Sequence, residues 1–206
     1  MGIRIGPKYK IARRLQEKIF PKTQTTKFAI AGSETRKPGG NRRRNISEYG
    51  RQLMEKQKAK YTYGVAERQF LGYIKKVRAM KNVNVSEEIF KLLETRLDNV
   101  VFRLGLVHSR MFARQVVSHG HILVNGKRVT VPSYTVRPGD KITVRPQSQT
   151  KGMFTSLAER LKGYSTPTWL VFDEDKMTGE VKTAPTYGET ESNLNFALIL
   201  EYYSRV

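Results

Sequence analysis

Asn125-Gly126 stands between two short β-prone arms, which is the strongest local signal for a two-residue hairpin turn. A short helix is expected directly before this hairpin, because apolar residues recur at helical spacing from Arg110 to His119 and Gly120 follows. Ser109 is a suitable N-cap for that helix. Helix and hairpin are separated by so few residues that they must pack against each other within one small module.

A longer helix is predicted immediately before the short one. Ser86 is followed by Glu87 and Glu88, so we expect an N-cap at Ser86 and one helix from there to Leu104. Its apolar side chains fall on a single stripe, and Gly105 ends it. Two helices therefore meet across a tight turn and lead into a hairpin, an arrangement that we call the helix-helix-hairpin.

Two further helices are predicted before residue 86. Ser47 is a suitable N-cap for a basic helix that runs to about Lys60 and is broken by residues 61–64. A second helix fits residues 65–80, where apolar and basic side chains separate onto different faces. Both helices present cationic side chains beside an apolar contact surface.

Shorter elements are predicted after the hairpin. A turn at residues 138–140, Pro-Gly-Asp, feeds a strand. Residues 150–163 fit a helix or a surface segment, and Trp169–Phe172 fits a buried strand that is followed by a turn at 175–179. The apolar segment 194–203 is expected to pack back on the fold.

The chain carries a large excess of positive charge. Lys and Arg number 38 against 18 acidic residues, which gives a formal net charge of +20. The excess lies in residues 1–145, whereas residues 146–206 carry slightly more acidic than basic side chains. Such self-repulsion is relieved by a polyanionic partner, which we therefore expect to bind the first two thirds of the chain.

Several classes of site are excluded by composition and spacing. The 206 residues contain no cysteine, which excludes disulfides, thiolate metal sites and a cysteine nucleophile. His108, His119 and His121 lack carboxylates at ligand spacing, so we expect neither a metal nor another cofactor. No apolar run is long enough for a signal peptide or a membrane span, which favours a soluble intracellular protein.

The helix-helix-hairpin is predicted to carry a basic ridge. Arg110 and Arg114 are four residues apart and therefore project from the same side of the short helix, while apolar residues turn inward. Phosphates and ribose hydroxyls of a folded RNA are the natural targets. The end of the helix and the hairpin extend this surface with His119, Asn125, Lys127 and Arg128. Before the module, the expected RNA contacts are Arg13, Arg14, Arg51, Lys56, Lys58 and Arg68.

Other interpretations of these residues stay open. A pair of arginines on a short helix is also typical of a solvated face, and a two-helix corner also fits a DNA-binding protein, although the hairpin competes for the same surface. The tripeptide 96–98, Arg-Leu-Asp, resembles the catalytic aspartate motif of pseudouridine synthases, but Asp98 lies within an apolar helical stripe. We expect Asp98 to pair with a nearby arginine, and we predict no catalytic residue. Tyr61 and Tyr63 fit the core and base stacking equally well.

The predicted fold class is α+β: a mostly helical part, a helix-helix-hairpin RNA-binding module and a small β-sheet. Residues 1–45 are expected to form a basic extension that becomes ordered on RNA. Residues 46–92 are expected to form helices. Residues 93–185 then form the module, with its core at 93–145 and strands appended.

Three stretches of the chain carry a resemblance to a known family. They are Ser47–Lys58 with Tyr63–Phe70, Leu93–Gly105 with Ser109-Arg110, Ala113–His119 and Val124–Gly126, and finally Pro167–Leu170 with Leu200–Arg205. In order and spacing they resemble the bacterial-type family of small-subunit ribosomal protein S-four, in its cysteine-free form without zinc. The resemblance covers the whole chain, except that the 20s and 30s match poorly.

The resemblance implies that the C-terminal segment 186–206 completes a helical domain at 46–92, and that the module, of the alpha-L type, is inserted into it. It also implies a structural protein rather than an enzyme. Such a protein binds small-subunit (16S-type) rRNA directly, helps to nucleate subunit assembly, and lines the channel through which mRNA enters, contributing to translational accuracy. The cluster Arg42-Arg43-Arg44 is similar to the family's mRNA-facing residues. The resemblance also implies neighbouring proteins of the S-three and S-five types, no DNA partner, and a cytoplasmic ribosome, with an organellar ribosome left open.

Overall fold

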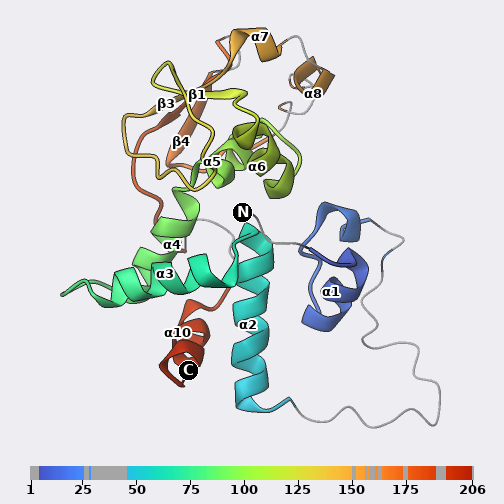
Figure 1. Ribbon diagram of the computed structural model, residues 1–206, viewed down its shortest axis with the longest axis vertical. Coiled ribbons are helices and arrows are strands. Elements are labelled where there is room, and N and C mark those ends of the chain that lie inside the picture. Colours follow the sequence, from blue (N-terminus) through green and yellow to red (C-terminus); the bar gives the residue numbers. More distant parts are fainter. Residues whose placement is uncertain are drawn as a thin grey trace. The chain divides into compact units, whose positions relative to one another are not determined.

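The computed structural model describes residues 5–25, 28, 46–149, 152–155, 157, 161, 164–173, 176–188 and 194–205. The chain divides into two compact units, Met1–Ile74 with Asn193–Val206 and Lys75–Ser192. We call the first the helical unit and the second the sheet unit, since Figure 1 shows helices in the first and the strands in the second. The predicted α+β class is therefore confirmed.

The helical unit is organised along one long helix. Its elements are α1 (Lys8–Leu15), the short 3-10 helix η1 (Pro21–Thr23), α2 (Glu48–Tyr63), the first part of α3 (Glu67–Arg78) and α10 (Phe196–Arg205). Helix α2 begins as predicted, because the Ser47 hydroxyl accepts a hydrogen bond from the Gly50 N–H at 3.2 Å. It runs past the predicted end at Lys60 to Tyr63, and Gly64 ends it in a left-handed conformation with φ of 63°.

The C-terminal helix α10 packs along α2. The rings of Tyr49 and Tyr202 lie 5.6 Å apart, and the Gln52 amide donates to the Glu201 carboxylate at 2.9 Å. The Glu55 carboxylate accepts a hydrogen bond from the Asn195 N–H at 2.8 Å, directly before the first turn of α10. The apolar C-terminal segment thus packs back on the helical unit through buried and polar contacts.

The sheet unit combines short helices with a five-stranded antiparallel sheet. Its elements after α3 are α4 (Val85–Glu94), α5 (Leu97–Arg103), α6 (Arg110–Ser118), β1 (Ile122–Val124), β2 (Lys127–Arg128), β3 (Lys141–Val144), α7 (Pro146–Gln149), α8 (Gly152–Thr155), β4 (Leu170–Asp173) and β5 (Thr178–Val181). The strand order is β2-β1-β3-β5-β4, so β2 and β4 are the two edges. One core of buried apolar side chains joins α5 and α6 to the sheet. It includes Phe154, Leu157 and Leu161 from segment 150–163, which was predicted to be a helix or a surface segment and lies partly outside the described residues.

The prediction of one helix from Ser86 to Leu104 is wrong. Asn84, not Ser86, is the N-cap, and its side chain accepts a hydrogen bond from the Ser86 N–H at 3.1 Å. The helix ends at Glu94 and a new one starts at Leu97, because Arg96 is extended and pairs with Thr135 as an isolated β-bridge. An extended residue interrupts the helical hydrogen-bond ladder, although the apolar spacing continues through it.

The C-terminal strands also differ from prediction. Trp169 and Leu170 are buried, but Val171 is 38% exposed, because successive side chains of a strand point to opposite faces of the sheet. The turn expected at 175–179 is shorter, since β5 begins at Thr178, while residue 175 lies outside the described part. Strand β5 was not predicted, and it lies between β3 and β4 in the sheet.

Candidate nucleic-acid interface

The corner between α5 and α6 is held by a buried apolar contact. Val100 and Val101 of α5 and Val116 and Val117 of α6 are all buried in the core of the sheet unit. Gly105, between the two helices, has φ of 75°, and a Cβ there would meet the side chains of Leu161 and Tyr164. Glycine therefore permits both the tight turn and the close packing against the turn. The corner is closely packed, which suits a surface that must match a folded partner.

A buried polar network lies beneath the start of α6. The Arg103 guanidinium donates to both carboxylate oxygens of Glu94 at 3.0 Å, and Glu94 is fully buried. The Asn99 amide donates to the same carboxylate at 2.9 Å, and its own oxygen accepts from the Arg110 guanidinium at 2.7 Å. Arg110 also lies 4.4 Å from the centre of the Phe102 ring. Arg110, predicted to face RNA with Arg114, is thus held against the module and is only partly exposed.

A second buried ion pair fixes the entrance to α5. Arg96 is 1% exposed, and its guanidinium donates to the two carboxylate oxygens of Asp98 at 3.0 and 2.6 Å. The backbone N–H groups of Leu97 and Asp98 donate to the carbonyls of Tyr134 and Pro132 at 2.8 and 3.1 Å. The prediction that Asp98 pairs with a nearby arginine is confirmed. This carboxylate is engaged in the structure of the module, which leaves it no role as an exposed catalytic group.

The hairpin forms as predicted and is tied to its neighbours. Asn125 and Gly126 have φ of 50° and 77°, which is the signature of a type I′ turn between β1 and β2. The Asn125 side chain donates to the Asp140 carboxylate at 2.8 Å and accepts from the Lys141 N–H at 2.9 Å. Asn125 therefore holds the hairpin to the start of β3, a structural role beside the RNA contact predicted for it.

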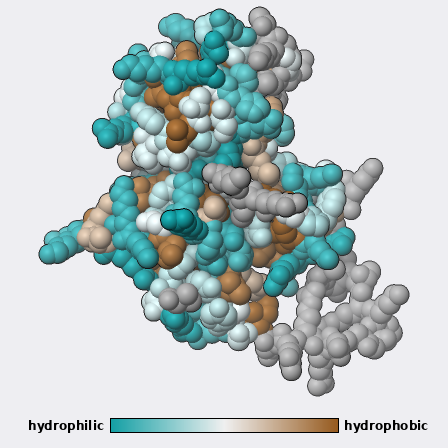
Figure 2. All heavy atoms as spheres, in the orientation of Figure 1, coloured by the Kyte–Doolittle hydropathy of each residue, from teal (hydrophilic) through white to brown (hydrophobic). Residues whose placement is uncertain are grey.

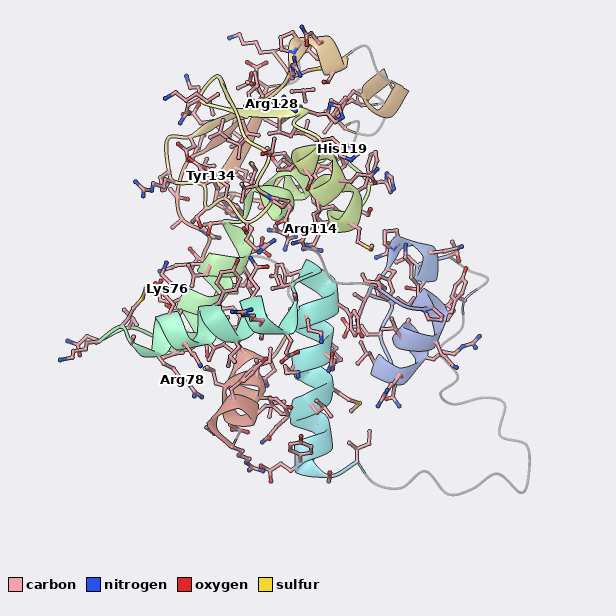
Figure 3. All side chains as sticks on the ribbon, in the orientation of Figure 1. Lys76, Arg78, Arg114, His119, Arg128 and Tyr134 are labelled. Atoms are coloured by element: carbon pink, nitrogen blue, oxygen red, sulfur yellow. The ribbon has the colours of Figure 1, made fainter. Side chains whose placement is uncertain are left out.

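The hairpin and the end of α6 together form the basic surface of the module. The Arg128 guanidinium donates to the His119 carbonyl at 3.3 Å, which joins the second strand to the C-terminus of the helix. Arg128, Lys127 and the His119 ring are exposed, and Arg114 is half-buried on the same helix. Figure 3 shows Arg114 and His119 on α6 and Arg128 on the adjacent hairpin. A cation at the negative end of the helix dipole is also electrostatically favourable.

The three histidines lie at the two ends of α6 and have different surroundings: His108 precedes the helix, whereas His119 and His121 follow it with ring centres 6.0 Å apart. His108 is exposed and stacks on the Phe112 ring at 5.0 Å. His121 is buried, with its Nδ1 2.9 Å from the Ser148 hydroxyl. Within the described residues, no group of three His, Asp or Glu side chains is arranged to hold a metal ion.

The sequence-predicted contacts in the helical unit divide into two groups. Arg13, Arg14, Arg51 and Arg68 are exposed. Lys56, by contrast, is buried, because its ammonium pairs with Glu67 at 2.9 Å and lies 4.7 Å from the Tyr202 ring.

Three further residues of α2, Lys58, Tyr61 and Tyr63, are also partly or fully buried. The Lys58 ammonium lies between Glu17 at 3.1 Å and Glu55 at 3.3 Å, with 22% of its side chain exposed. Tyr63 is buried in the core, whereas Tyr61 is half-buried. The cluster Arg42-Arg43-Arg44 lies outside the described residues.

Some exposed groups were not among the predicted contacts. Lys75, Lys76 and Arg78 are exposed along the second half of α3, and Figure 3 shows Lys76 and Arg78 there. Tyr134, in the loop that receives the N–H groups of α5, is 39% exposed. The high density of basic residues at 75–78 was the available signal for the first group, whereas nothing local marks Tyr134. Figure 2 shows that the visible face of each unit is mostly hydrophilic, with smaller apolar patches.

No helix among the described residues is both long enough and apolar enough to cross a membrane. Residues 4–94 match the family described as the ribosomal protein S4/S9 N-terminal domain, and residues 95–142 match the S4 domain family. The junction between the two matches falls between α4 and α5, where Arg96 breaks the expected helix.

Curated relatives match the chain along nearly its whole length. The small ribosomal subunit protein uS4 of Roseiflexus sp. (strain RS-1) is 44% identical over 206 residues, which is 97% of this chain and 98% of that protein. The uS4 proteins of Natranaerobius thermophilus and Lacticaseibacillus casei (strain BL23) are 44% and 42% identical, each over 97% of this chain and over 98% and 97% of their own lengths. The resemblance seen in the sequence is thereby confirmed. The chain belongs to the uS4 family of small ribosomal subunit proteins, a family of structural proteins rather than enzymes.

Proposed function

We propose that this chain is a structural constituent of the small ribosomal subunit that binds small-subunit rRNA directly. The observation that carries the proposal is the basic surface formed by α6 and the hairpin, on a scaffold stiffened by two buried ion pairs. Family membership supports the same conclusion. Stiffness matters because recognition of folded RNA depends on shape and on contacts with phosphates and ribose hydroxyls.

The binding energy comes mainly from phosphate neutralisation. Each phosphate that a Lys or Arg neutralises releases counterions and adds about 0.7 to 0.9 to the slope of log affinity against log salt. A footprint of about ten such contacts gives a slope of about −7 to −9. We place Arg114, Lys127 and Arg128 in this footprint, together with the exposed arginines of the helical unit, and His119 beside them as a further contact that adds no charge. The buried Lys56 is left out of it.

Filter binding to an rRNA fragment over a salt series tests the proposal, with a matched pair of variants. Lys127→Gln removes a charge at β2, one edge of the sheet, whereas Lys176→Gln removes a charge beside β4, at the opposite edge. We expect Lys127→Gln to reduce the steepness of the salt slope by about 0.7 to 0.9 and Lys176→Gln to leave it unchanged. A wild-type slope near zero, or equal effects of the two variants, refutes the assignment.

A DNA-binding role for the α5–α6 corner predicts a different outcome. In a helix-turn-helix the second helix lies in the major groove, but here the hairpin is bound to the end of that helix through Arg128. We therefore expect folded rRNA to displace the protein from duplex DNA in direct competition. Preferential binding to the duplex would favour the DNA-binding alternative instead.

The finer role is also proposed. We infer that the protein helps to nucleate subunit assembly and that Arg42, Arg43 and Arg44 line the channel through which mRNA enters, contributing to translational accuracy. The support is the family resemblance and the basic character of residues 1–45. Neighbours of the S-three and S-five types, and a cytoplasmic ribosome, belong to the same proposal. Cosedimentation with the small subunit through a high-salt wash is measured for the wild type and for a variant with Arg42, Arg43 and Arg44 replaced by glutamine. If the three arginines face mRNA and do not anchor the protein to rRNA, the variant cosediments like the wild type.

The domain division proposed for this function keeps a basic extension at 1–45, a helical domain at 46–92 with 186–206, and a module at 93–185. Its support is that the helix-helix-hairpin lies within one compact unit, while α2 and α10 lie together in the other. Two separate rRNA contact surfaces on one chain would then bind neighbouring parts of the same RNA.

A further inference from the structure

One acidic side chain lies within a basic stretch of the sheet unit. Asp140 is the only acidic residue in the segment 121–145, which contains five basic residues. It stands directly before β3 and is partly buried. By its charge alone, an aspartate at this position opposes the binding of a polyanion. Its hydrogen bonds give it a second effect on the same surface.

The Asp140 carboxylate joins the hairpin turn to the turn at 137–140. One oxygen accepts a hydrogen bond from the Asn125 side chain at 2.8 Å, and the other accepts from the Arg137 N–H at 2.8 Å. Asn125 in turn donates its N–H to the Lys141 carbonyl at 2.8 Å and accepts from the Lys141 N–H at 2.9 Å. The Asp140 carbonyl accepts from the Val181 N–H at 3.1 Å. The hairpin turn, β3 and β5 are thus held together at one corner.

This corner supports a strand that has few contacts of its own. Strand β2 consists of Lys127 and Arg128 and forms one edge of the sheet, where it pairs with β1. Arg128, labelled in Figure 3, is also tied to the His119 carbonyl. Lys127 is exposed and lies two positions after Asn125. A contact that fixes the Asn125 side chain therefore also limits the movement of the Lys127 backbone.

We propose that Asp140 is a positioning residue for rRNA binding, which acts through Asn125 to hold the hairpin cations Lys127 and Arg128 in a fixed arrangement. The inference rests on the proposed function, because it concerns affinity for the rRNA that the basic surface binds. Pre-organised groups bind more tightly, since they lose less freedom on association. Asp140 therefore strengthens binding to a polyanion although its own charge opposes it.

The sign of one affinity change separates the two effects of Asp140. Asp140→Ala removes a negative charge, so charge alone predicts that affinity for an rRNA fragment rises by about twofold or less. Positioning predicts a fall of about two- to tenfold, because the hydrogen bonds that hold the turn are lost. Asp140→Asn has the same charge as Asp140→Ala but keeps one acceptor oxygen, so we expect a smaller loss. Affinity that rises or stays unchanged with Asp140→Ala overturns the inference.

Asp173→Ala is the matched control. Asp173 also accepts a hydrogen bond within a turn, from the Lys176 N–H at 3.1 Å, but it lies on β4 at the opposite edge of the sheet. We expect this variant to bind rRNA at least as tightly as the wild type. Urea unfolding identifies the conditions in which every variant is folded, and affinities are compared there. An equal loss with Asp173→Ala would trace the effect to turns in general and overturn the inference.

Asn125→Gly tests the connection itself. Glycine permits the φ of 50° at this position, and the substitution changes no charge while it removes both side-chain hydrogen bonds. We expect it to weaken rRNA binding about as much as Asp140→Ala does, and the double variant to bind no more weakly than either single one. Additive losses would mean that the two residues act independently, against the inference.

Lys127→Gln in the Asp140→Ala background connects the effect to a hairpin cation. In the wild-type background this change is expected to reduce the steepness of the salt slope by about 0.7 to 0.9. We expect a smaller reduction in the Asp140→Ala background, because Lys127 is then no longer held in place. An undiminished reduction would mean that Lys127 is placed without Asp140.

Failure of the inference is distinguishable from failure of the proposed function. If the wild type binds rRNA with the expected salt dependence but Asp140→Ala binds as tightly, the inference alone fails. If the wild type shows no salt-dependent binding, the proposed function fails and the inference fails with it.

Discussion

Breaking the buried pair between Arg96 and Asp98 provides a strong test of how the module is built. The substitution Asp98→Asn keeps the size of the side chain but removes its charge. In the wild type, two nitrogens of Arg96 lie 3.0 and 2.6 Å from the Asp98 carboxylate oxygens. In the variant, the Arg96 guanidinium, which is 1% exposed, loses this counter-charge. A buried charge without its partner is strongly unfavourable in a medium of low dielectric constant.

The size of the effect follows from the depth of the site. Removing one member of a buried pair costs about 3 to 5 kcal/mol, which is about a fifth or more of the stability of an ordinary domain. For a unit of this size, each kcal/mol lowers the melting temperature by about 3 to 5 °C. We therefore expect Asp98→Asn to lower the melting temperature of the sheet unit by about 10 to 25 °C.

The sole tryptophan of the chain makes the measurement specific. Trp169 is 1% exposed in the core of the sheet unit, so its fluorescence follows the unfolding of that unit. The double variant Arg96→Met with Asp98→Leu removes both charges, and we expect it to recover most of the lost stability, since apolar pairs of similar volume often replace buried ion pairs without loss. A cost below about 1 kcal/mol for Asp98→Asn, or a double variant as unstable as the single one, refutes the reasoning.

Three further predictions concern single side chains. Burial opposes the ionisation of Glu67, but hydrogen bonds from Tyr203 and two lysines outweigh it and lower the pKa of this carboxyl to about 2. Because this pKa lies below its value of 4.5 in the unfolded chain, the ionised carboxylate stabilises the fold above pH 4.5. This contribution is lost as the pH falls through about 2. Glu67→Gln should therefore destabilise the protein by about 1 to 2 kcal/mol at pH 7, a figure reduced for partial exposure, and the difference should shrink in urea titrations between pH 4.5 and 2. Gly120→Ala and Gly126→Ala each place a side chain at a left-handed φ, 72° and 77°, so each should cost about 1 kcal/mol in urea unfolding. The added methyl at 120 also displaces the flexible end of the exposed Arg128 side chain, which can move away at little cost, so urea midpoints that differ strongly between the two variants would contradict this reasoning. Gly120→Ala should also weaken rRNA binding in the filter assay, whereas Gly126→Ala should leave it within about twofold, because only the first displaces a cation of the basic surface.

The local signals of the module were readable because they depend on neighbouring residues alone. Ser109 caps α6 through a hydrogen bond from the Phe112 N–H, and Gly120 ends that helix region with a positive φ. Asn125-Gly126 forms the turn that its backbone preferences favour. Together with the excess of basic residues, these signals were sufficient for the fold class and for the class of partner.

The functional surface was only partly predictable, because it depends on which cations are paired inside the protein. Lys56 and Arg110 look in the sequence like the exposed Arg13. In the structure, however, Lys56 contacts Glu67 and Tyr202. Arg110 contacts Asn99 and Phe102. Those partners come from other helices or from distant residues of the chain. No pattern of spacing along one helix reveals such pairings.

The amino-acid sequence by itself determined the helix caps at Ser47 and Ser109, the hairpin, the α+β class and the polyanionic partner, because each of these follows from local backbone preference or from total charge. Tertiary structure alone decided the break at Arg96 and the existence of β5. The first N–H groups of α5 are satisfied by carbonyls of a loop more than thirty residues away, at Pro132 and Tyr134. Strand β5 contains Gly179, although glycine is disfavoured in strands by local propensity. Glycine fits this position because a Cβ there would collide with Leu104, which lies between α5 and α6. Long-range hydrogen bonds and close packing therefore overrode local preference at both places.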